Sequence, residues 1–536
     1  MYSIENRKNI MKRVVIFLIS ILSYSFCLAQ DAEMKELTDK ARKGDAISMN
    51  KLGDMYYYGE IVPRDYKKAF EWYTKASEKG NASAMYNLGY MYYHGEGLPV
   101  DYKKSFEWWE KGANAGNSDA MFEVACMYIQ SKGVSPDYQK AIEWFYKAAQ
   151  KGNVESIYNL GLFYHDGISV QKDYVKAFDW YIKAAEKGYA PAMNNLGLMY
   201  FNGEGIPKDT QKAVELCTKA AEKGLTQSMY GLGCRYYDGD GVSQDYTKAF
   251  EWFYKAAQKG DVESMYNLGC LYANGEGVSK DYQKAFEWFA KAAEKGSVKA
   301  LNSLGSMYYF GRGVQQDYQK AFEWYSKGAV KGEATAMYNL GCMYEKGIVQ
   351  KDYKKAAEWW EKAAEKGYVE ALNNIGIMFY YGKGVQKDYE KAFEWFTKSA
   401  EKGDMAGTYS LGYMCYKGEG VQKDYKKAFE CFKKVEEVNW NQAKGKIKGF
   451  LAEMYYNGYY VAKDYNKAFK LAKEGAEYKN DPSGAAMRIL SACYRYGLGT
   501  PIDNDKAESW LKESANYNDE KAQGVLGIES IIFSFE

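Results

Sequence analysis

The sequence predicts an all-α solenoid of about thirteen helix-turn-helix repeats, each about 36 residues long. The first reason is internal repetition: the text of residues 245–260 returns almost unchanged at 281–296, 317–332 and 388–403. The second reason is length, because 536 residues exceed what one compact core accommodates and no shift in composition divides the chain. A solenoid escapes this limit because each repeat buries its apolar face only against its neighbours.

The N-terminal segment, residues 1–29, has the pattern of a secretory signal peptide. A basic pair precedes an apolar run at residues 14–26, and Ala29 supplies a small residue where cleavage is expected. The run is too short for a membrane span, which needs about 20 residues. Export to the periplasm or the outside of a bacterial cell is therefore expected. Lipid attachment at Cys27 stays open, since Phe26 stands where a lipoprotein signal has a small residue.

The remaining chain divides into regular and degenerate repeats. Residues 30–44 read as a half-repeat that caps the stack, and eleven regular repeats fill residues 45–439. Two looser repeats occupy residues 440–518, and residues 519–536 resemble a last capping helix. Atypical units at both ends are expected because a stack must cover its terminal apolar faces.

The first helix of a repeat is clear in the text that begins at residue 81. Met85, Leu88, Gly89 and Tyr92 recur at the spacing of one helix face. Gly89 has no side chain, so a second helix can approach closely. Gly95 supplies the left-handed position that ends the helix.

The second helix begins at an aspartate and ends at a glycine. Asp101 is a natural N-cap because its carboxylate accepts backbone N–H groups, and Gly116 is the stop. In another copy Ala249, Trp252 and Ala256 form a small-large-small face that we expect to interlock with the first helix. Each repeat is therefore a helical hairpin.

The repeated text resembles a known family. The pattern Leu-Gly-x-x-Tyr-x-x-Gly-x-Gly-Val-x-x-Asp-x-x-Lys-Ala-x-x-Trp-x-x-Lys-Ala-Ala-x-x-Gly at residues 268–296 is similar to the Sel1-like repeat, a relative of the tetratricopeptide repeat. The resemblance extends over residues 45–515. It implies a right-handed α/α superhelix, first helices that line a concave surface, and a role as a scaffold or adaptor for other proteins.

Two departures from the consensus predict irregular geometry. The repeat from residue 333 is one residue short at its turn, residues 347–350, so a local change of pitch is expected there. Between Val435 and Gly449 the spacing lengthens and the usual Lys-Gly stop is missing. That stretch is the best candidate for a hinge or an irregular loop.

The search for chemistry predicts no catalytic, cofactor-binding or metal site. Lys plus Arg number 72 and Asp plus Glu 70, a balance that disfavours nucleic acid as a partner. His94 and His165 lie two repeats apart, and helices are spaced about 8–10 Å, so the pair cannot share one ligand and is interpreted as solvent-facing. The aspartate that recurs in every repeat is interpreted as a cap, and the Gly-Glu-Gly segments as turns.

The cysteines fall into two groups. Three of them, Cys234, Cys270 and Cys342, occupy equivalent positions in different repeats. Equivalent helices of neighbouring repeats are about 8–10 Å apart, whereas the Cα atoms of a disulfide are at most about 7 Å apart. Free thiols are therefore expected at these three positions. Cys415 and Cys431 replace large aromatic residues on facing helices of one repeat. Because the loss of both aromatic rings would leave a void, we predict a disulfide between Cys415 and Cys431, with free thiols as the alternative.

A second stripe on the first helix is turned away from the apolar face and is predicted to face the groove. Tyrosine dominates it, and tyrosine offers large contact area at low entropic cost. The alternative is that these rings pack between neighbouring first helices and contact no ligand. The groove candidates are Tyr86, Tyr90, Tyr93, Tyr158, His165, Phe201, Tyr230, Tyr237, Tyr266, Tyr409, Tyr413 and Tyr416.

The sequence therefore favours a non-enzymatic, exported scaffold that binds a protein or peptide in its groove. The repeats leave no room for a catalytic domain, and no nucleophile, base and orienter form a set. Two alternatives stay open. One is an enzyme that acts on cell-wall material or a β-lactam, a class that some exported, cysteine-rich relatives of this repeat family are reported to resemble. The other is a purely structural envelope protein. The sequence identifies neither the partner nor the oligomeric state.

Overall fold

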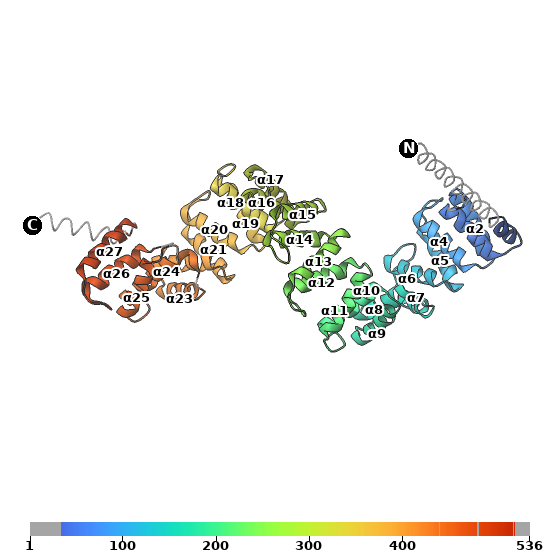
Figure 1. Cartoon of the computed structure of the whole chain (residues 1–536), viewed down its shortest axis with the longest axis horizontal. Helices are drawn as coiled ribbons and strands as arrows, with labels where there is room; N and C mark the ends of the chain where they lie inside the picture. The colour runs from blue at the N-terminus through green and yellow to red at the C-terminus, as the bar shows by residue number, and fades with distance from the viewer. Residues whose placement is uncertain (1–33, 60, 439, 480–481, 518, 520–536) are drawn as a thin grey trace, which may run out of the picture. The chain divides into compact units, whose positions relative to one another are not determined.

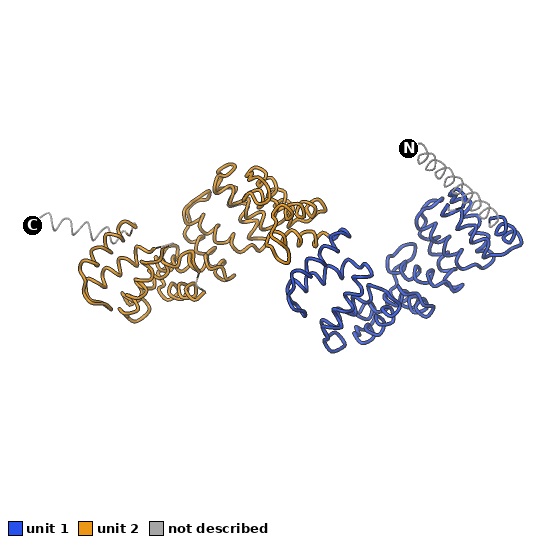
Figure 2. Tube along the Cα trace, viewed as in Figure 1, with its two compact units in different colours: residues 1–261 blue, residues 262–536 orange. Residues whose placement is uncertain are grey.

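The structure is a computed structural model, and it describes residues 34–59, 61–438, 440–479, 482–517 and 519. The predicted signal peptide at residues 1–29, with Cys27, lies outside these residues. So does the predicted capping helix at residues 519–536, apart from Asp519. The described residues form two compact units, one up to residue 261 and one from residue 262 onward (Figure 2).

The first unit is a stack of helical hairpins that follows a helical stretch at residues 34–42 (Figure 1). Its first helices are α2 (Ala46–Tyr58), α4 (Ala82–His94), α6 (Ser118–Gln130), α8 (Val154–Asp166), α10 (Ala190–Asn202) and α12 (Thr226–Asp238). Its second helices are α3 (Tyr66–Glu78), α5 (Tyr102–Asn114), α7 (Tyr138–Gln150), α9 (Tyr174–Glu186), α11 (Thr210–Glu222) and α13 (Tyr246–Gln258).

The second unit repeats the arrangement. Its first helices are α14 (Val262–Asn274), α16 (Val298–Phe310), α18 (Ala334–Lys346), α20 (Val369–Tyr381), α22 (Met405–Lys417), α24 (Lys444–Asn457) and α26 (Gly484–Tyr496). Its second helices are α15 (Tyr282–Glu294), α17 (Tyr318–Val330), α19 (Tyr353–Glu365), α21 (Tyr389–Glu401), α23 (Tyr425–Glu437), α25 (Tyr465–Ala476) and α27 (Asn504–Asn516). No strand occurs in the described residues, and the predicted all-α repeat fold is confirmed.

The helices begin and end where the sequence predicts. The Asp101 carboxylate accepts the backbone N–H of Lys104 at 3.0 Å and opens α5. Gly95 closes α4 with φ +74°, a left-handed conformation that side chains other than glycine rarely adopt. The same cap opens the other second helices, through Asp65, Asp137, Asp173, Asp209, Asp245, Asp281, Asp317, Asp352, Asp388, Asp424, Asp464 and Asp503.

Most of the regular hairpins are closed by a glycine packed against an aromatic ring. A Cβ added to Gly233 of α12 would lie 2.6 Å from the Phe253 ring of α13, so only glycine permits this approach. The expectation that Trp252 fills this role is wrong, since Phe253 is the residue that is 1% exposed. Trp252 is half-buried beside the helix, with Lys255 Nζ 4.2 Å from its ring centroid. The reason is register: Ala249 and Phe253 are four residues apart and share the buried face.

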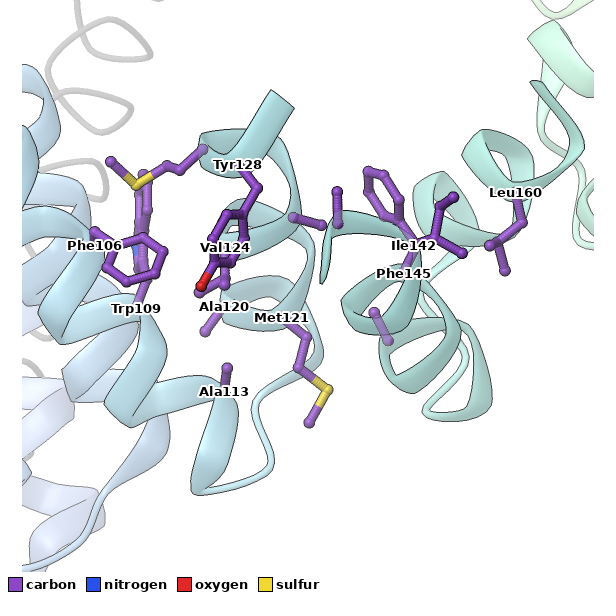
Figure 3. Packing of buried hydrophobic residues seen from close by; sticks show 14 of the residues in the cluster. Phe106, Trp109, Ala113, Ala120, Met121, Val124, Tyr128, Ile142, Phe145 and Leu160 are labelled. Carbon is purple, nitrogen blue, oxygen red and sulfur yellow. The ribbon is translucent and has the colours of Figure 1, made fainter. Parts of the chain in front are cut away.

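Within a unit, clusters of buried apolar residues join neighbouring hairpins. Figure 3 shows one cluster that joins Trp109 of α5, Val124 of α6, Phe145 of α7 and Leu160 of α8. All four side chains are buried. The repeats that share this cluster therefore stabilise one another through apolar packing.

Both predicted irregularities can be located. In the short repeat the Asp352 N–H still donates to the Tyr344 carbonyl at 3.1 Å, as Asp101 does to Tyr92 at 3.0 Å, so the closing bond survives the missing residue. Near residue 440 the chain forms a 3-10 turn, Asn441–Ala443, before α24 begins. The irregular loop is thus confirmed, whereas the change of pitch and the hinge stay predictions.

Candidate functional site

The tyrosine stripe of α4 is half-buried and belongs partly to the packing. The Tyr86 ring stacks near Trp109 with centroids 6.3 Å apart, and the Tyr90 ring lies 4.2 Å from that of His94. The Tyr93 hydroxyl accepts from Lys132 Nζ at 2.5 Å in the next repeat. Burial raises the pKa of Tyr86 to about 12. These rings therefore contribute to the packing of the repeats, and part of their surface stays accessible to solvent.

Neighbouring first helices are tied together along this face by polar side chains. Asn195 Nδ2 donates to the Tyr158 hydroxyl at 3.2 Å, one repeat earlier. In the second unit Asn374 Nδ2 donates to the Tyr338 hydroxyl at 3.3 Å. Each bond holds a tyrosine hydroxyl in one orientation.

A second series of contacts joins the end of one first helix to the turn of the next repeat. The Tyr380 hydroxyl donates to Glu419 at 2.6 Å, and Tyr57 donates to Glu96 in the same way. His165 occupies the equivalent position, and its Nε2 lies 3.1 Å from Glu204. The interpretation of His165 as solvent-facing is wrong, because its ring is half-buried between this carboxylate and the next residue along the chain.

Two of the groove candidates are buried and do not line the surface. Phe201 is covered by the Arg235 guanidinium, whose central carbon lies 3.4 Å from the ring centroid. Tyr416 is packed 5.1 Å from the Phe450 ring. The sequence could not show this, since each position is covered by a side chain of the next repeat.

The other candidates stay half-buried, and several contact the buried ring of their own hairpin. Tyr230 lies 6.0 Å from Phe253 by ring centroids, and Tyr266 lies 5.5 Å from Phe289. The half-buried candidates beyond α4 are Tyr158, His165, Tyr230, Tyr237, Tyr266, Tyr409 and Tyr413.

The first-helix face holds cavities where the stripe is richest in aromatic residues. In the second unit a cavity of about 380 Å³ contains the predicted Tyr409 and Tyr413. Its full lining is Ile377, Tyr380, Tyr381, Phe396, Tyr409, Ser410, Tyr413, Met414, Lys446 and Phe450. In the first unit a cavity of about 200 Å³ is lined by Tyr57, Tyr58, Tyr73, Tyr86, Asn87 and Tyr90. A larger cavity, of about 730 Å³, lies among turns at residues 455–499 and touches none of the candidates.

Several unpredicted residues of the 380 Å³ cavity have signals that are visible in the sequence. Ile377 is a large apolar residue at a stripe position that is polar or small in many other repeats. Phe450 is a large apolar residue at the position of Asn87, outside the stripe, where most regular repeats have a polar residue. Tyr381 is the last residue of α20. Lys446 lies in the stretch between Val435 and Gly449 that the sequence predicts to be a hinge or an irregular loop, but it belongs to α24.

The predicted disulfide is contradicted. Cys415 and Cys431 are both free thiols, Cys415 buried and Cys431 half-buried. Cys431 occupies the position of Trp252, which lies beside the core, while Phe432 fills the position of Phe253. The joint replacement therefore leaves no void to close. The free thiols expected at Cys234, Cys270 and Cys342 are confirmed.

The described residues hold no group of three His, Cys, Asp or Glu side chains placed to bind a metal ion. In the same ranges, no helix combines the length and apolar character that a bilayer crossing requires.

These features define a helical-hairpin repeat protein whose candidate site is a helix face. The chain belongs to the Sel1 repeat family, whose model matches thirteen segments. They are residues 46–81, 82–117, 118–153, 154–189, 190–225, 226–261, 262–297, 298–332, 334–368, 369–404, 406–434, 450–477 and 484–518. Repeats of this family mediate protein–protein interactions, and proteins built from them are generally non-enzymatic.

Two solved structures are similar to this chain. The c5321 protective antigen of uropathogenic Escherichia coli, which displays an SLR fold, is 33% identical with a TM-score of 0.68, over 86% of this chain and 97% of that one. A Sel1 repeat protein from Oxalobacter formigenes is 30% identical with a TM-score of 0.48, over 58% of this chain and 91% of that one. No curated protein matches the chain.

Proposed function

We propose that the protein is a non-enzymatic, exported scaffold that binds an extended segment of a partner protein on its first-helix faces. The observation that carries the proposal is the 380 Å³ cavity. Its lining comes mostly from the first helices α20, α22 and α24, includes Tyr409 and Tyr413, and is completed by Phe396 of the second helix α21. Pockets of this size with mostly apolar walls and a few polar groups are typical binding sites.

The chemistry of the walls supports recognition of a protein segment. Half-buried tyrosines lose little side-chain entropy on binding because their rings are already held by packing and by bonds such as Tyr380 to Glu419. Such rings offer both apolar area and a hydroxyl. A row of them along successive repeats suits an extended chain better than a compact ligand.

Binding on this face is tested by photo-crosslinking in the native cells. A photoreactive residue at Tyr381, 62% exposed at the cavity rim, is expected to form adducts with a partner protein. The control site is Val330, 81% exposed at the end of the second helix α17. Adducts that form only at Val330, or equally at both sites, contradict binding on the first-helix face.

Export is tested separately. The signal pattern predicts a mature chain that begins at Gln30, which intact mass spectrometry of the protein from its native cells measures. The similar E. coli protein is a protective antigen, which supports a location reached from outside the cell. A chain that keeps residues 1–29 and stays with the cytoplasmic fraction contradicts export.

A further inference from the structure

The 380 Å³ cavity lies beside the irregular connection that precedes α24. Phe450 of α24 stacks on Phe432 with ring centroids 5.0 Å apart and planes within 6° of parallel. The same ring lies 5.7 Å from Tyr413. This aromatic wall is specific to these repeats, because the position of Phe450 is held by a polar side chain in most of the regular repeats.

The cavity is apolar in its depth and polar at its rim. Phe396 and Met414 are buried and form its floor. The hydroxyl of Ser410 and the exposed ring of Tyr381 lie in the lining closer to solvent. A large aromatic or aliphatic side chain that enters here is desolvated on most of its surface, which is the environment of an interface anchor.

The rim carries positive charge. Lys383 Nζ lies 5.5 Å from the Tyr381 ring centroid, and Lys417 Nζ lies 5.8 Å from that of Tyr413. Lys446 is exposed and lines the cavity itself. The nearby carboxylate of Glu419 already accepts the Tyr380 hydroxyl at 2.6 Å.

Acidic side chains lie at the smaller aromatic cavity of the first unit. Tyr73 donates to the Asp54 carboxylate at 2.9 Å, and Tyr57 donates to Glu96. Glu123 on α6 interacts electrostatically with Tyr86 and Tyr90. The lysines at the rim of the second-unit cavity favour an anionic ligand there.

We propose that this cavity binds a large apolar side chain of an extended partner peptide that carries Asp or Glu residues next to that anchor. The inference rests on the proposed function and adds the chemistry of the segment. The anchor fills the pocket between Phe450 and Phe396, and the acidic neighbours lie against Lys383, Lys417 and Lys446. Because those lysines are at the surface, raised salt weakens the acidic contribution.

Labelled synthetic peptides and the full chain test the specificity by fluorescence anisotropy. The first peptide has one Trp flanked by Glu residues, the second has Ser in place of that Trp, and the third has Lys in place of the Glu residues. The first is expected to bind at least about tenfold more tightly than the other two. Equal binding of the Lys peptide, or of the Ser peptide, overturns the proposal.

Matched variants locate the binding site. Tyr381→Ala and Lys446→Glu are each expected to weaken the first peptide about tenfold. Tyr496→Ala is the control for the ring, since Tyr496 is 64% exposed at the last residue of α26, and Lys426→Glu is the control for the charge. Loss of affinity in the controls, or none in the first pair, places the peptide elsewhere and overturns the proposal.

The two proposals fail in different ways. Crosslinks at Tyr381 without preference for the acidic Trp peptide overturn the inferred specificity and leave binding on the first-helix face intact. Crosslinks absent from Tyr381, together with no binding of any of the three peptides, overturn both.

Discussion

Gly231 and Gly233 lie two residues apart on α12, and an alanine is expected to act in opposite directions at the two positions. A Cβ on Gly231 meets no atom within 4 Å. A Cβ on Gly233 lies 2.6 Å from two atoms of the Phe253 ring, which is buried on α13. Both residues are helical, so the intrinsic preference of the backbone for alanine is the same at each.

The magnitudes follow from these contacts. Replacing a helical glycine with alanine stabilises a helix by about 1 kcal/mol, and Gly231→Ala should gain this amount. At Gly233 the same gain is offset by overpacking, which costs about 1–3 kcal/mol because the buried ring must shift against its neighbours. Gly233→Ala should therefore lower the free energy of unfolding by up to about 2 kcal/mol.

Urea unfolding followed by far-ultraviolet circular dichroism measures both changes as shifts of the midpoint. The double variant Gly233→Ala with Phe253→Leu is the internal check: a smaller side chain at residue 253 should remove part of the clash, so the two costs should not add. A Gly233→Ala protein that is stabilised as much as the Gly231→Ala protein would refute the reasoning that the hairpin closes on this glycine.

Two further predictions concern titration and thiols. Burial raises the pKa of Glu123 to about 7, above its unfolded value, so this carboxyl contributes stability below about pH 4 that is lost as the pH rises through 7. Glu123→Gln should then stabilise the protein at pH 8 and change little at pH 4; an equal effect at both pH values would contradict the assignment. Cys415 and Cys431 are free, so the thiol count of the unfolded protein should be the same before and after reduction. Burial raises the pKa of Cys415 to about 11, so native alkylation of Cys415, followed by peptide mass spectrometry, should be far slower than alkylation in urea.

The helix caps and the hairpin contacts could be predicted from the sequence because each depends on residues that are close together in the chain. Asp101 as a cap, Gly95 as a left-handed stop and Gly233 as a point of close approach each depend on one turn of chain or one hairpin. The sequence repeats these signals many times, and repetition makes the period unmistakable. The family assignment to Sel1 repeats follows from the same text.

The errors arose where burial depends on a neighbouring helix. Trp252 and Phe253 are adjacent aromatic residues, and only the rotation of α13 against α12 decides that Phe253 enters the core. That misassignment also produced the disulfide prediction, since Cys431 stands at the Trp252 position. Phe201 lies on the stripe by spacing, yet Arg235 from the next repeat covers it.

The sequence determined the repeat length, the helix boundaries and the stripe of tyrosines on the first helices, since these follow from periodicity and capping chemistry. Tertiary structure alone decided where that stripe opens into a cavity. The 380 Å³ pocket forms where Phe450 of α24 comes to lie against Tyr413 of α22 beyond an irregular connection, and Lys446 lines it. Such a site depends on the packing of side chains from three repeats, and no single repeat encodes it.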